Sequence, residues 1–211
     1  MNAIHRAPFI VFEGIEGCGK STQIARLAAR LEAGGRSCLR TREPGGTPLG
    51  EALRDLLLGW KGSELDGLTE LFLLEASRRA HVRQVISPAL QAGTIVISDR
   101  FADSSVAYQG GGRGLDPELI ERLNRIATEG IEPDLTVLLD LAPEEGLRRV
   151  RERERAEDRL ERELIDFHRR VREAYLSLAR RRDEQRFRLI DANLPVDAIH
   201  ARVCEWAGAL L

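Results

Sequence analysis

The sequence predicts an α/β domain built on an open, parallel, five-stranded sheet with helices on both faces. Five short apolar, β-rich runs recur along the chain, at 9–12, 37–41, 94–97, 135–139 and 187–190, and segments with helical periodicity separate them. Strands that alternate with helices indicate βαβ crossovers and therefore a parallel sheet. The runs at 94–97 and 135–139 are almost entirely apolar, as is typical of strands covered on both faces. A glycine-rich turn after the first run adds a ligand-binding loop at the edge of this sheet.

That turn, Gly14-Ile-Glu-Gly-Cys-Gly-Lys-Ser21, fits the phosphate-binding P-loop pattern at every required position. It lies between the first strand and a segment whose apolar residues have helical spacing, which is the context that a P-loop needs. Inward-pointing N–H groups and the helix N-terminus bind an anion there. The sequence therefore predicts binding of a nucleoside triphosphate, with Lys20 at the β- and γ-phosphates and Ser21 on Mg²⁺. The predicted contacts are Gly14, Ile15, Glu16, Gly17, Cys18, Gly19, Lys20, Ser21 and Thr22.

The later helices are predicted from caps and periodicity. Thr47-Pro48 combines an N-cap with proline at the first helical position and predicts a helix through Leu58. A longer helical stretch runs from 68 to 91. Asp116-Pro117 repeats the capping signal for a helix that ends near Gly130, and a last helix is expected at about 194–211.

The segment 148–172 is dominated by Arg and Glu. Charge runs of this kind usually form a solvated, ion-paired helical hairpin. In a P-loop fold, an arginine-rich segment after the fourth strand is equally suited to close over the phosphates as a lid. Composition alone leaves both interpretations open.

Length and composition favour one domain over residues 1–211. The chain has 211 residues, a hydrophobic fraction of 43% and a formal net charge of −2, which disfavours a dedicated nucleic-acid-binding protein. No apolar run reaches membrane-spanning length, and the first residues lack the apolar core of a signal peptide. Three scattered cysteines suggest a reducing compartment, so we expect a cytoplasmic protein. Cys18 lies in the P-loop, where it is either a redox-sensitive thiol or a small side chain that fits.

Polar residues follow each strand, where ligands bind in open α/β sheets. Asp99 closes the third apolar run, in the position of an acid that organises Mg²⁺ through water, although it also suits an N-cap. Arg100 presents a planar fork that matches a phosphate. Further candidates for a second phosphate site are Arg42, Arg54 and Arg78. A second anion site facing the P-loop distinguishes a kinase from a hydrolase.

The stretch 101–114 carries side chains suited to a base or a sugar, followed by four glycines. Ser105, Tyr108 and Gln109 are the candidates for such contacts. The glycines either let a loop approach the ligand closely or terminate a helix.

Together these segments resemble the thymidylate kinase family over nearly the whole chain. The resemblance rests on the P-loop with Glu13 before it, Thr41-Arg-Glu-Pro-Gly-Gly-Thr47, Asp99-Arg-Phe with Ser104, Ser105, Tyr108 and Gln109 after it, Pro133-Asp-Leu-Thr136, and Asp158-Arg-Leu-Glu161. It implies a P-loop nucleoside monophosphate kinase fold with an arginine-rich lid at about 148–163, and usually a homodimer. It implies transfer of the γ-phosphoryl group of ATP to dTMP, with Mg²⁺, for dTTP synthesis, and no nucleic-acid or membrane partner.

The resemblance also implies roles for individual residues. Arg54 and Arg100 would hold the dTMP phosphate, Arg78 the O4 edge of thymine, and Ser105 would face N3. Tyr108 would help to exclude a 2′-hydroxyl, and Glu13 would lie near the sugar and the metal. The implied dTMP site is Glu13, Glu43, Pro44, Arg54, Leu74, Arg78, Arg100, Ser104, Ser105, Tyr108 and Gln109; the implied metal set is Ser21, Asp99 and Glu13.

The P-loop carries Glu16 where some members have an arginine, and the arginines follow in the lid, which resembles the bacterial type. The expected catalytic residues are Lys20, Arg100, Glu16 and Arg153, of which Arg153 acts on the transferring phosphoryl group, while Arg149 and Arg151 contact ATP. Arg151 and Arg155 compete with Arg153 for that role.

One position departs from the family pattern. The aromatic residue that stacks on thymine is replaced by Leu74, and Phe72 lies two residues earlier on a different part of the helix. Either Leu74 forms a plain apolar wall or the local geometry brings Phe72 into place. This departure keeps a kinase for another nucleoside monophosphate as one alternative; a nucleotide-dependent switch ATPase is the alternative from another class.

Overall fold

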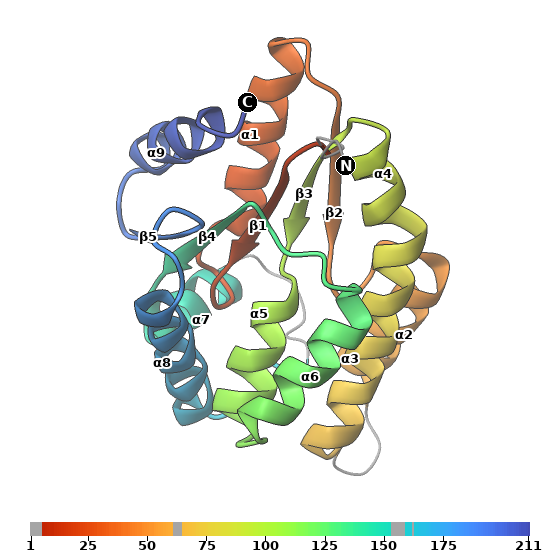
Figure 1. Cartoon of the computed structure of the whole chain (residues 1–211). Coiled ribbons are helices and arrows are strands. Elements are labelled where there is room, and N and C mark those ends of the chain that lie inside the picture. The colour runs from red at the N-terminus through yellow and green to blue at the C-terminus, as the bar shows by residue number, and fades with distance from the viewer. Residues whose placement is uncertain (1–5, 61–64, 153–158, 162) are drawn as a thin grey trace.

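The computed structural model describes residues 6–60, 65–152, 159–161 and 163–211. Its centre is a five-stranded sheet in the order β2-β3-β1-β4-β5, in which every neighbouring pair is parallel (Figure 1). The strands are β1 (Phe9–Glu13), β2 (Cys38–Arg42), β3 (Ile95–Asp99), β4 (Leu135–Asp140) and β5 (Phe187–Asp191). All five predicted strands and the predicted sheet are confirmed.

Helices cover both faces of the sheet (Figure 1). Within the described residues they are α1 (Lys20–Ala33), α2 (Pro48–Gly59), α3 (Gly67–His81), η1 (Val82–Ile86), α4 (Ser87–Gln91), α5 (Ala102–Ser105), η2 (Val106–Gly112), α6 (Pro117–Thr128), α7 (Pro143–Arg151), α8 (Ile165–Arg181) and α9 (Val196–Gly208). Both predicted caps are present: Thr47 Oγ accepts from Gly50 N at 2.9 Å, and Asp116 accepts from Glu118 N at 3.0 Å.

The alternation of β1 side chains divides the core in two. Ile10 and Phe12 join the larger apolar cluster, while Phe9 and Val11 join a smaller cluster that includes Val82 of η1. Successive side chains of a strand point to opposite faces, so a fully buried strand needs apolar residues at every position. This requirement is why β1 is readable from the sequence as one continuous run.

The glycines after Gln109 do not form an open loop near a ligand, so that interpretation is wrong. Gly110, Gly111 and Gly112 belong to η2, a π-helical segment that continues α5. A Cβ at Gly111 would lie 2.5 Å from Ala174 Cβ, and one at Gly112 would lie 2.5 Å from Phe167 Cε2. The glycines therefore allow α8 to pack directly against η2. The chain turns only at Gly114, whose φ is 78°.

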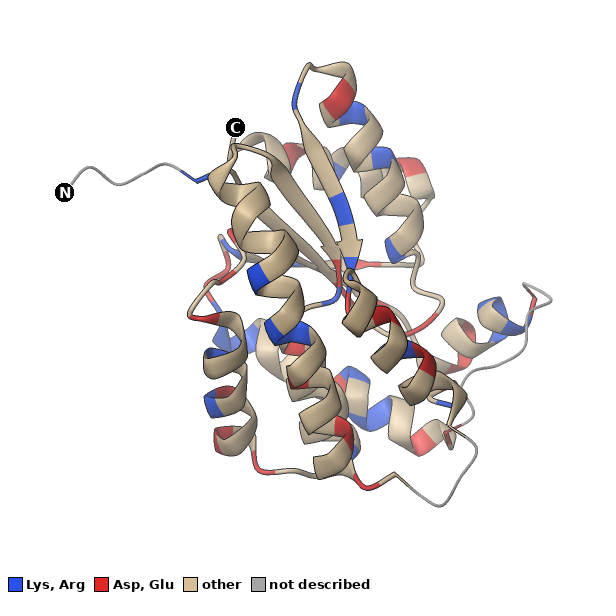
Figure 2. Ribbon diagram, turned by 90° about the vertical axis from the view of Figure 1, so that its right-hand side faces the viewer, with Lys and Arg blue, Asp and Glu red and all other residues tan. Residues whose placement is uncertain are grey.

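The long helical stretch predicted at 68–91 is also interrupted by a π-helical segment, η1, between α3 and α4. Charged residues lie mainly on helices and loops (Figure 2). On α7, Arg148 and Arg149 both pair with Glu145, at 2.7 and 2.6 Å, as the ion-paired interpretation of the Arg-rich run expects. Within the described residues, no helix is both long and apolar enough to cross a membrane.

Candidate functional site

A cleft opens at the carboxyl ends of β1 and β3, between the P-loop, the segment after β2, α3 and η2. Sequence-distant elements supply its lining: Glu16, Gly17, Gly19, Lys20, Ser21, Thr22, Arg42, Glu43, Pro44, Arg54, Leu58, Leu74, Arg78, Asp99, Arg100, Ser104, Ser105, Tyr108, Gln109, Val150, Leu160 and Glu161. This is the edge of an open parallel sheet at which ligands bind.

The P-loop occupies one end of this cleft. Gly17 has φ 75°, and a Cβ there would collide with the carbonyl oxygen of Gly146 on α7, so only glycine fits. Lys20, the first residue of α1, is buried and its Nζ donates to the carbonyl oxygens of Gly14 and Ile15 at 3.1 and 3.0 Å. The ammonium group therefore lies over the loop, at the N-terminus of a helix, where phosphate oxygens bind.

Arg100 lies beside the P-loop and is held in an unusual backbone conformation with φ 73°. Its N–H donates to Phe12 O at 2.9 Å, and Ser98 Oγ donates to its carbonyl oxygen at 2.8 Å, which stabilises that turn. The guanidinium donates to Glu16 Oε1 at 2.8 Å and stacks over the ring of Tyr108, 4.8 Å from its centroid. These two contacts hold the side chain in one direction beside the P-loop.

The pKa of the Glu16 carboxyl group is changed by its neighbours. Burial raises its pKa, but the charges of Arg100 and Lys20 and a hydrogen bond from Tyr108 outweigh burial, so the pKa lies below its ordinary value. Tyr108 Oη donates to Glu16 Oε1 at 2.7 Å. Glu16 is thus an ionised partner that balances two cations at the P-loop end of the cleft.

Glu13 lies beneath the cleft and is absent from its lining. Its Oε1 accepts from Phe101 N at 2.8 Å, and its Oε2 accepts from Ser104 Oγ and Tyr175 Oη, both at 2.7 Å. Burial raises the pKa of this carboxyl to about 7, against the opposing charge of Arg100. Its position makes Glu13 a support for the segment that carries Arg100 and Ser104.

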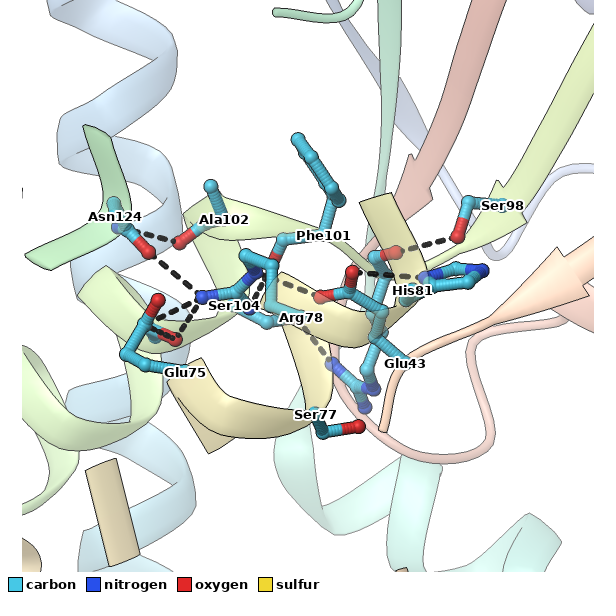
Figure 3. Close-up of polar contacts among 12 residues, drawn as sticks. Glu43, Glu75, Ser77, Arg78, His81, Ser98, Phe101, Ala102, Ser104 and Asn124 are labelled. Carbon is cyan, nitrogen blue, oxygen red and sulfur yellow. Dashed lines mark hydrogen bonds and ion pairs between the residues drawn. The ribbon is translucent and has the colours of Figure 1, made fainter. Parts of the chain in front are cut away.

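Arg78 forms the other end of the cleft and is almost completely buried. Figure 3 shows it between Glu43 on one side and Glu75 with Asn124 on the other. Nε donates to Glu43 Oε2 at 2.7 Å, and Nη1 approaches Glu75 Oε1 at 2.5 Å and Asn124 Oδ1 at 2.7 Å. Nη2 donates to Phe101 O at 3.1 Å. Burial of so many charges is tolerated because each guanidinium edge meets an acceptor.

His81 completes this network one turn along α3. Its Nδ1 lies 3.0 Å from Glu43 Oε1 and its Nε2 lies 2.6 Å from Thr41 Oγ1. A Cβ at Gly46 would lie 2.5 Å from the imidazole ring, which explains one of the two glycines after β2. The segment after β2 is therefore fixed to α3 from both sides.

Asp99 and Ser21 offer the oxygen atoms for a divalent cation. Both border the cleft, and Asp99 Oδ1 is buried without a hydrogen-bond partner among the described residues. A buried, unpaired carboxylate oxygen is unfavourable unless it meets a cation or water. The described residues contain no cluster of three His, Cys, Asp or Glu side chains around a metal position. This donor set fits Mg²⁺, which keeps waters and phosphate oxygens as its other ligands.

A second ionic cluster surrounds Glu70 of α3, which is 1% exposed. Its Oε1 accepts from Gln109 Nε2 at 2.5 Å, and its Oε2 pairs with Arg159 and, at 3.4 Å, with Arg113. Arg159 Nε also donates to the carbonyl oxygen of Leu57 at 2.8 Å. The end of the predicted lid is thus anchored to α2 and α3, close to the cleft.

Most predicted site residues converge on the cleft. Those that do not border it are Gly14, Ile15 and Cys18, which form the buried body of the P-loop, and Glu13, Arg149 and Arg151. Arg149 pairs with Glu145 and donates to Ala192 O at 3.3 Å, beyond the P-loop. The predicted main lid arginine, Arg153, lies outside the described residues, as does Arg155.

The structure also shows which of two side chains, Leu74 or Phe72, forms the apolar wall of the cleft. Leu74 borders the cleft, whereas the side chain of Phe72 is 54% exposed on the outer side of α3. The regular helix turns Phe72 away, so Leu74 provides the apolar wall.

Several residues of the site were not predicted: Glu70, Glu75, Asn124, Arg159 and Tyr175. The sequence does contain a signal for Glu70 and Glu75, because these two charged residues interrupt an otherwise apolar helical stretch. Charged residues that stay buried in such a position need ionic partners.

The parallel five-stranded sheet, the P-loop and a second arginine-lined region in one cleft define a P-loop kinase with the nucleoside monophosphate kinase fold. The thymidylate kinase family profile matches residues 12–203, and the chain belongs to this family. The thymidylate kinase of Solidesulfovibrio magneticus is 51% identical over 209 residues, covering 96% of this chain and 100% of that protein. That of Thermomicrobium roseum is 53% identical over 201 residues, covering 93% and 94%. The crystal structure of thymidylate kinase from Ehrlichia chaffeensis superposes with a TM-score of 0.78 at 35% identity, covering 95% of this chain and 98% of that one.

Proposed function

We propose that this enzyme transfers the γ-phosphoryl group of ATP to dTMP, giving ADP and dTDP for dTTP synthesis. The observation that carries the proposal is one cleft with a P-loop at one end and Arg78, in a buried ionic network, at the other, with Arg100 between them. The family assignment and the resemblance of the segments after β2 and β3 to thymidylate kinases support the same substrate pair.

The reaction needs no strong general base, because the phosphate of a nucleoside monophosphate is already an ionised nucleophile at neutral pH. Catalysis then rests on positioning and electrostatics. Arg100 aims the acceptor phosphate, assisted by Arg54, and Lys20 neutralises the β- and γ-phosphate oxygens. Glu16 holds Arg100 in its direction until the acceptor binds. A Mg²⁺ ion held by Ser21 and, through water, by Asp99 would supply further charge neutralisation at the phosphates.

Acceptor choice rests on the buried end of the cleft. Tyr108 Oη is fixed between Arg100 at 2.9 Å and Glu16 at 2.7 Å, so its ring forms a rigid wall beside the sugar and disfavours a 2′-hydroxyl. Arg78 donates toward O4 of the base, and Leu74 packs against the ring. Glu43, Pro44, Ser104 and Gln109 shape the remaining walls.

The lid completes the proposal. Arg153 would stabilise the transferring phosphoryl group, since arginines in that role contribute roughly 10³–10⁵ in rate in related systems. Arg153→Ala should lower turnover far more than it weakens dTMP binding, and near-normal turnover would assign the role to Arg151 or Arg155.

We further propose a cytoplasmic homodimer. Exposed apolar side chains lie on two helices that pack against each other, α3 and α6: Leu68, Phe72, Leu119 and Ile126. Exposed apolar side chains on neighbouring helices suit a protein interface. Light scattering on the wild type and on Phe72→Glu tests the dimer, because a charge in a buried interface should give monomers. The free cysteines of the chain suit a reducing compartment.

The function is tested by an ADP-release assay with ATP and Mg²⁺ against dTMP, dUMP, dCMP, dAMP, dGMP and UMP. A strong preference for dTMP supports the proposal. ADP release that is indifferent to every acceptor would favour a switch ATPase instead.

A kinase for a different monophosphate remains the second candidate, because Leu74 stands where an aromatic ring usually stacks on thymine. An aromatic–base stack contributes about 1–3 kcal/mol to binding. Without that stack, the site has less selectivity for thymine over other bases. Equal rates with several acceptors in the same panel would favour this candidate.

A further inference from the structure

The buried end of the cleft contains a hydroxyl whose hydrogen is already committed. Ser105 is 1% exposed and borders the cleft, and its Oγ donates to Glu75 Oε1 at 3.2 Å. The same Oγ accepts from Arg78 Nη1 at 3.0 Å. A serine hydroxyl has one hydrogen and two lone pairs. At least one lone pair therefore remains, and toward the cleft Ser105 is an acceptor.

Glu75 is well suited to hold the hydroxyl in this orientation. It is a buried carboxyl group on α3, and its Oε1 meets both Ser105 and Arg78 Nη1, the latter at 2.5 Å. A guanidinium can only donate, so Oε1 must act as an acceptor there. Its other oxygen, Oε2, has no hydrogen-bond partner among the described residues. A proton on Oε2 would leave the acceptor role of Oε1 unchanged.

Beside this acceptor lies a donor. Arg78 Nη2 carries two hydrogens, and the hydrogen bond to Phe101 O accounts for one of them within the described part of the chain. The cleft thus presents a donor next to an acceptor. Thymine and uracil present the complementary pair, the acceptor O4 next to the donor N3–H. Cytosine presents the opposite pair, an amino donor next to the acceptor N3.

We propose that Glu75 is a positioning residue for base selection, which fixes the Ser105 hydroxyl as an acceptor and thereby rejects cytosine. This inference rests on the proposed function, since it assumes that the base lies against Arg78 and Ser105. Without Glu75 the hydroxyl is free to rotate and donate to N3 of cytosine. A fixed acceptor rejects cytosine strongly, because binding cytosine would leave buried polar groups unpaired. A hydroxyl that is free to rotate can pair with either base.

The test compares kcat/KM for dUMP and dCMP, which both lack the 5-methyl group and differ only at the edge that Ser105 reads. Glu75→Leu removes the acceptor and should lower the dUMP/dCMP ratio by about tenfold or more. The dTMP/dUMP ratio should stay unchanged, because it reports on the 5-methyl group alone. A merely structural defect would lower all three kcat/KM values together and leave both ratios as in the wild type.

Glu75→Gln is the matched control. Arg78 can only donate, so it holds the amide oxygen of glutamine at the Oε1 position and Ser105 keeps its acceptor. This variant should retain a dUMP/dCMP ratio close to that of the wild type. If Glu75→Leu does not fold, Ser105→Ala replaces it, because loss of the acceptor itself should lower the same ratio.

Two results would overturn the inference: a folded Glu75→Leu enzyme with an unchanged dUMP/dCMP ratio, or a Glu75→Gln enzyme that loses as much selectivity as Glu75→Leu. Either leaves the proposed function standing as long as the wild type prefers dTMP. A wild-type enzyme that does not phosphorylate dTMP would overturn both proposals.

Discussion

Loss of Arg78 should destabilise the fold strongly, because this buried guanidinium pairs with two buried carboxylates, Glu43 and Glu75. Its ion pairs with Glu43 and Glu75 span 2.7 and 2.5 Å, and all three side chains are less than a tenth exposed. Removing one partner of a buried pair costs about 3–5 kcal/mol, mainly because a charge is left unpaired. We therefore expect Arg78→Met to lower the free energy of unfolding by about 4 kcal/mol. In a chain of this length that corresponds to a fall in Tm of roughly 8–16 °C.

The size of this loss should depend on pH. Burial raises the pKa of Glu75, and the charge of Arg78 opposes that rise. Without Arg78 the pKa of folded Glu75 lies higher still, so the folded variant takes up a proton that the unfolded chain does not. The variant therefore regains stability as pH falls toward the ordinary glutamate pKa and loses it as pH rises. Glu13, whose pKa is about 7, titrates in both proteins and cancels in the comparison.

Urea unfolding followed by circular dichroism, at about pH 5.5 and about pH 8, measures both effects. The destabilisation should be larger at the higher pH. Adding Glu75→Gln to Arg78→Met should recover about 1–2 kcal/mol at that pH, since one buried charge is removed. Arg79→Met is the control, because its ion pair with Glu129 is more than a third exposed and contributes at most about 1 kcal/mol. A loss below about 1 kcal/mol for Arg78→Met, independent of pH, would refute the reasoning.

Three further substitutions test the packing, the base wall and the lid anchor. Gly112→Ala should lower the free energy of unfolding by about 1–3 kcal/mol, because its Cβ would lie 2.5 Å from Phe167; thermal unfolding measures this. Leu74→Phe should tighten dTMP binding by about 1 kcal/mol, roughly fivefold in Kd by calorimetry, since a ring can stack on the base. Arg159→Ala should lower kcat/KM for dTMP by about tenfold, because the buried Glu70 loses a charged partner.

Each of these has a control in the same chain. Gly208→Ala should not destabilise, because beyond the adjacent backbone of its own helix the described residues place nothing within 4 Å of the added Cβ. Leu74→Ile should leave dTMP affinity unchanged, and equal tightening by Ile and Phe would exclude stacking as the cause. Arg169→Ala should retain full activity, because its side chain is 56% exposed and pairs with Glu144 at the surface. Equal losses from Arg159→Ala and Arg169→Ala would show that the anchor has no special role.

The elements that could be predicted are those encoded by local signals. β1 is a continuous apolar run because both of its faces are buried, and the P-loop is a contiguous pattern whose backbone geometry follows from its glycines. The caps at Thr47 and Asp116 act within three residues. For these features, one stretch of sequence contains the whole physical cause.

The remaining features depend on residues far apart in the chain. Asn124 is 46 positions from Arg78, and Arg159 is 89 positions from Glu70, so neither pairing leaves a mark in local sequence. One of the two interpretations of the glycines at 110–112, a loop close to a ligand, is wrong for the same reason. The glycines allow a close approach, but the partner is α8, more than fifty residues later, and not a ligand.

The two ends of the cleft balance their charges in different ways. This difference allows one end to serve turnover and the other to serve the choice of acceptor base. Arg100 and Glu16 are each about 15% exposed, so an incoming phosphate can take over donors of Arg100 without stranding a buried charge. Arg78, Glu43 and Glu75 are nearly inaccessible, and displacing any one of them would leave another unpaired. The phosphate end can therefore rearrange during each turnover, while the base end stays fixed in its donor and acceptor pattern. Substitutions at Glu16 should accordingly affect turnover with every acceptor, whereas Glu75→Leu should affect which acceptor is chosen.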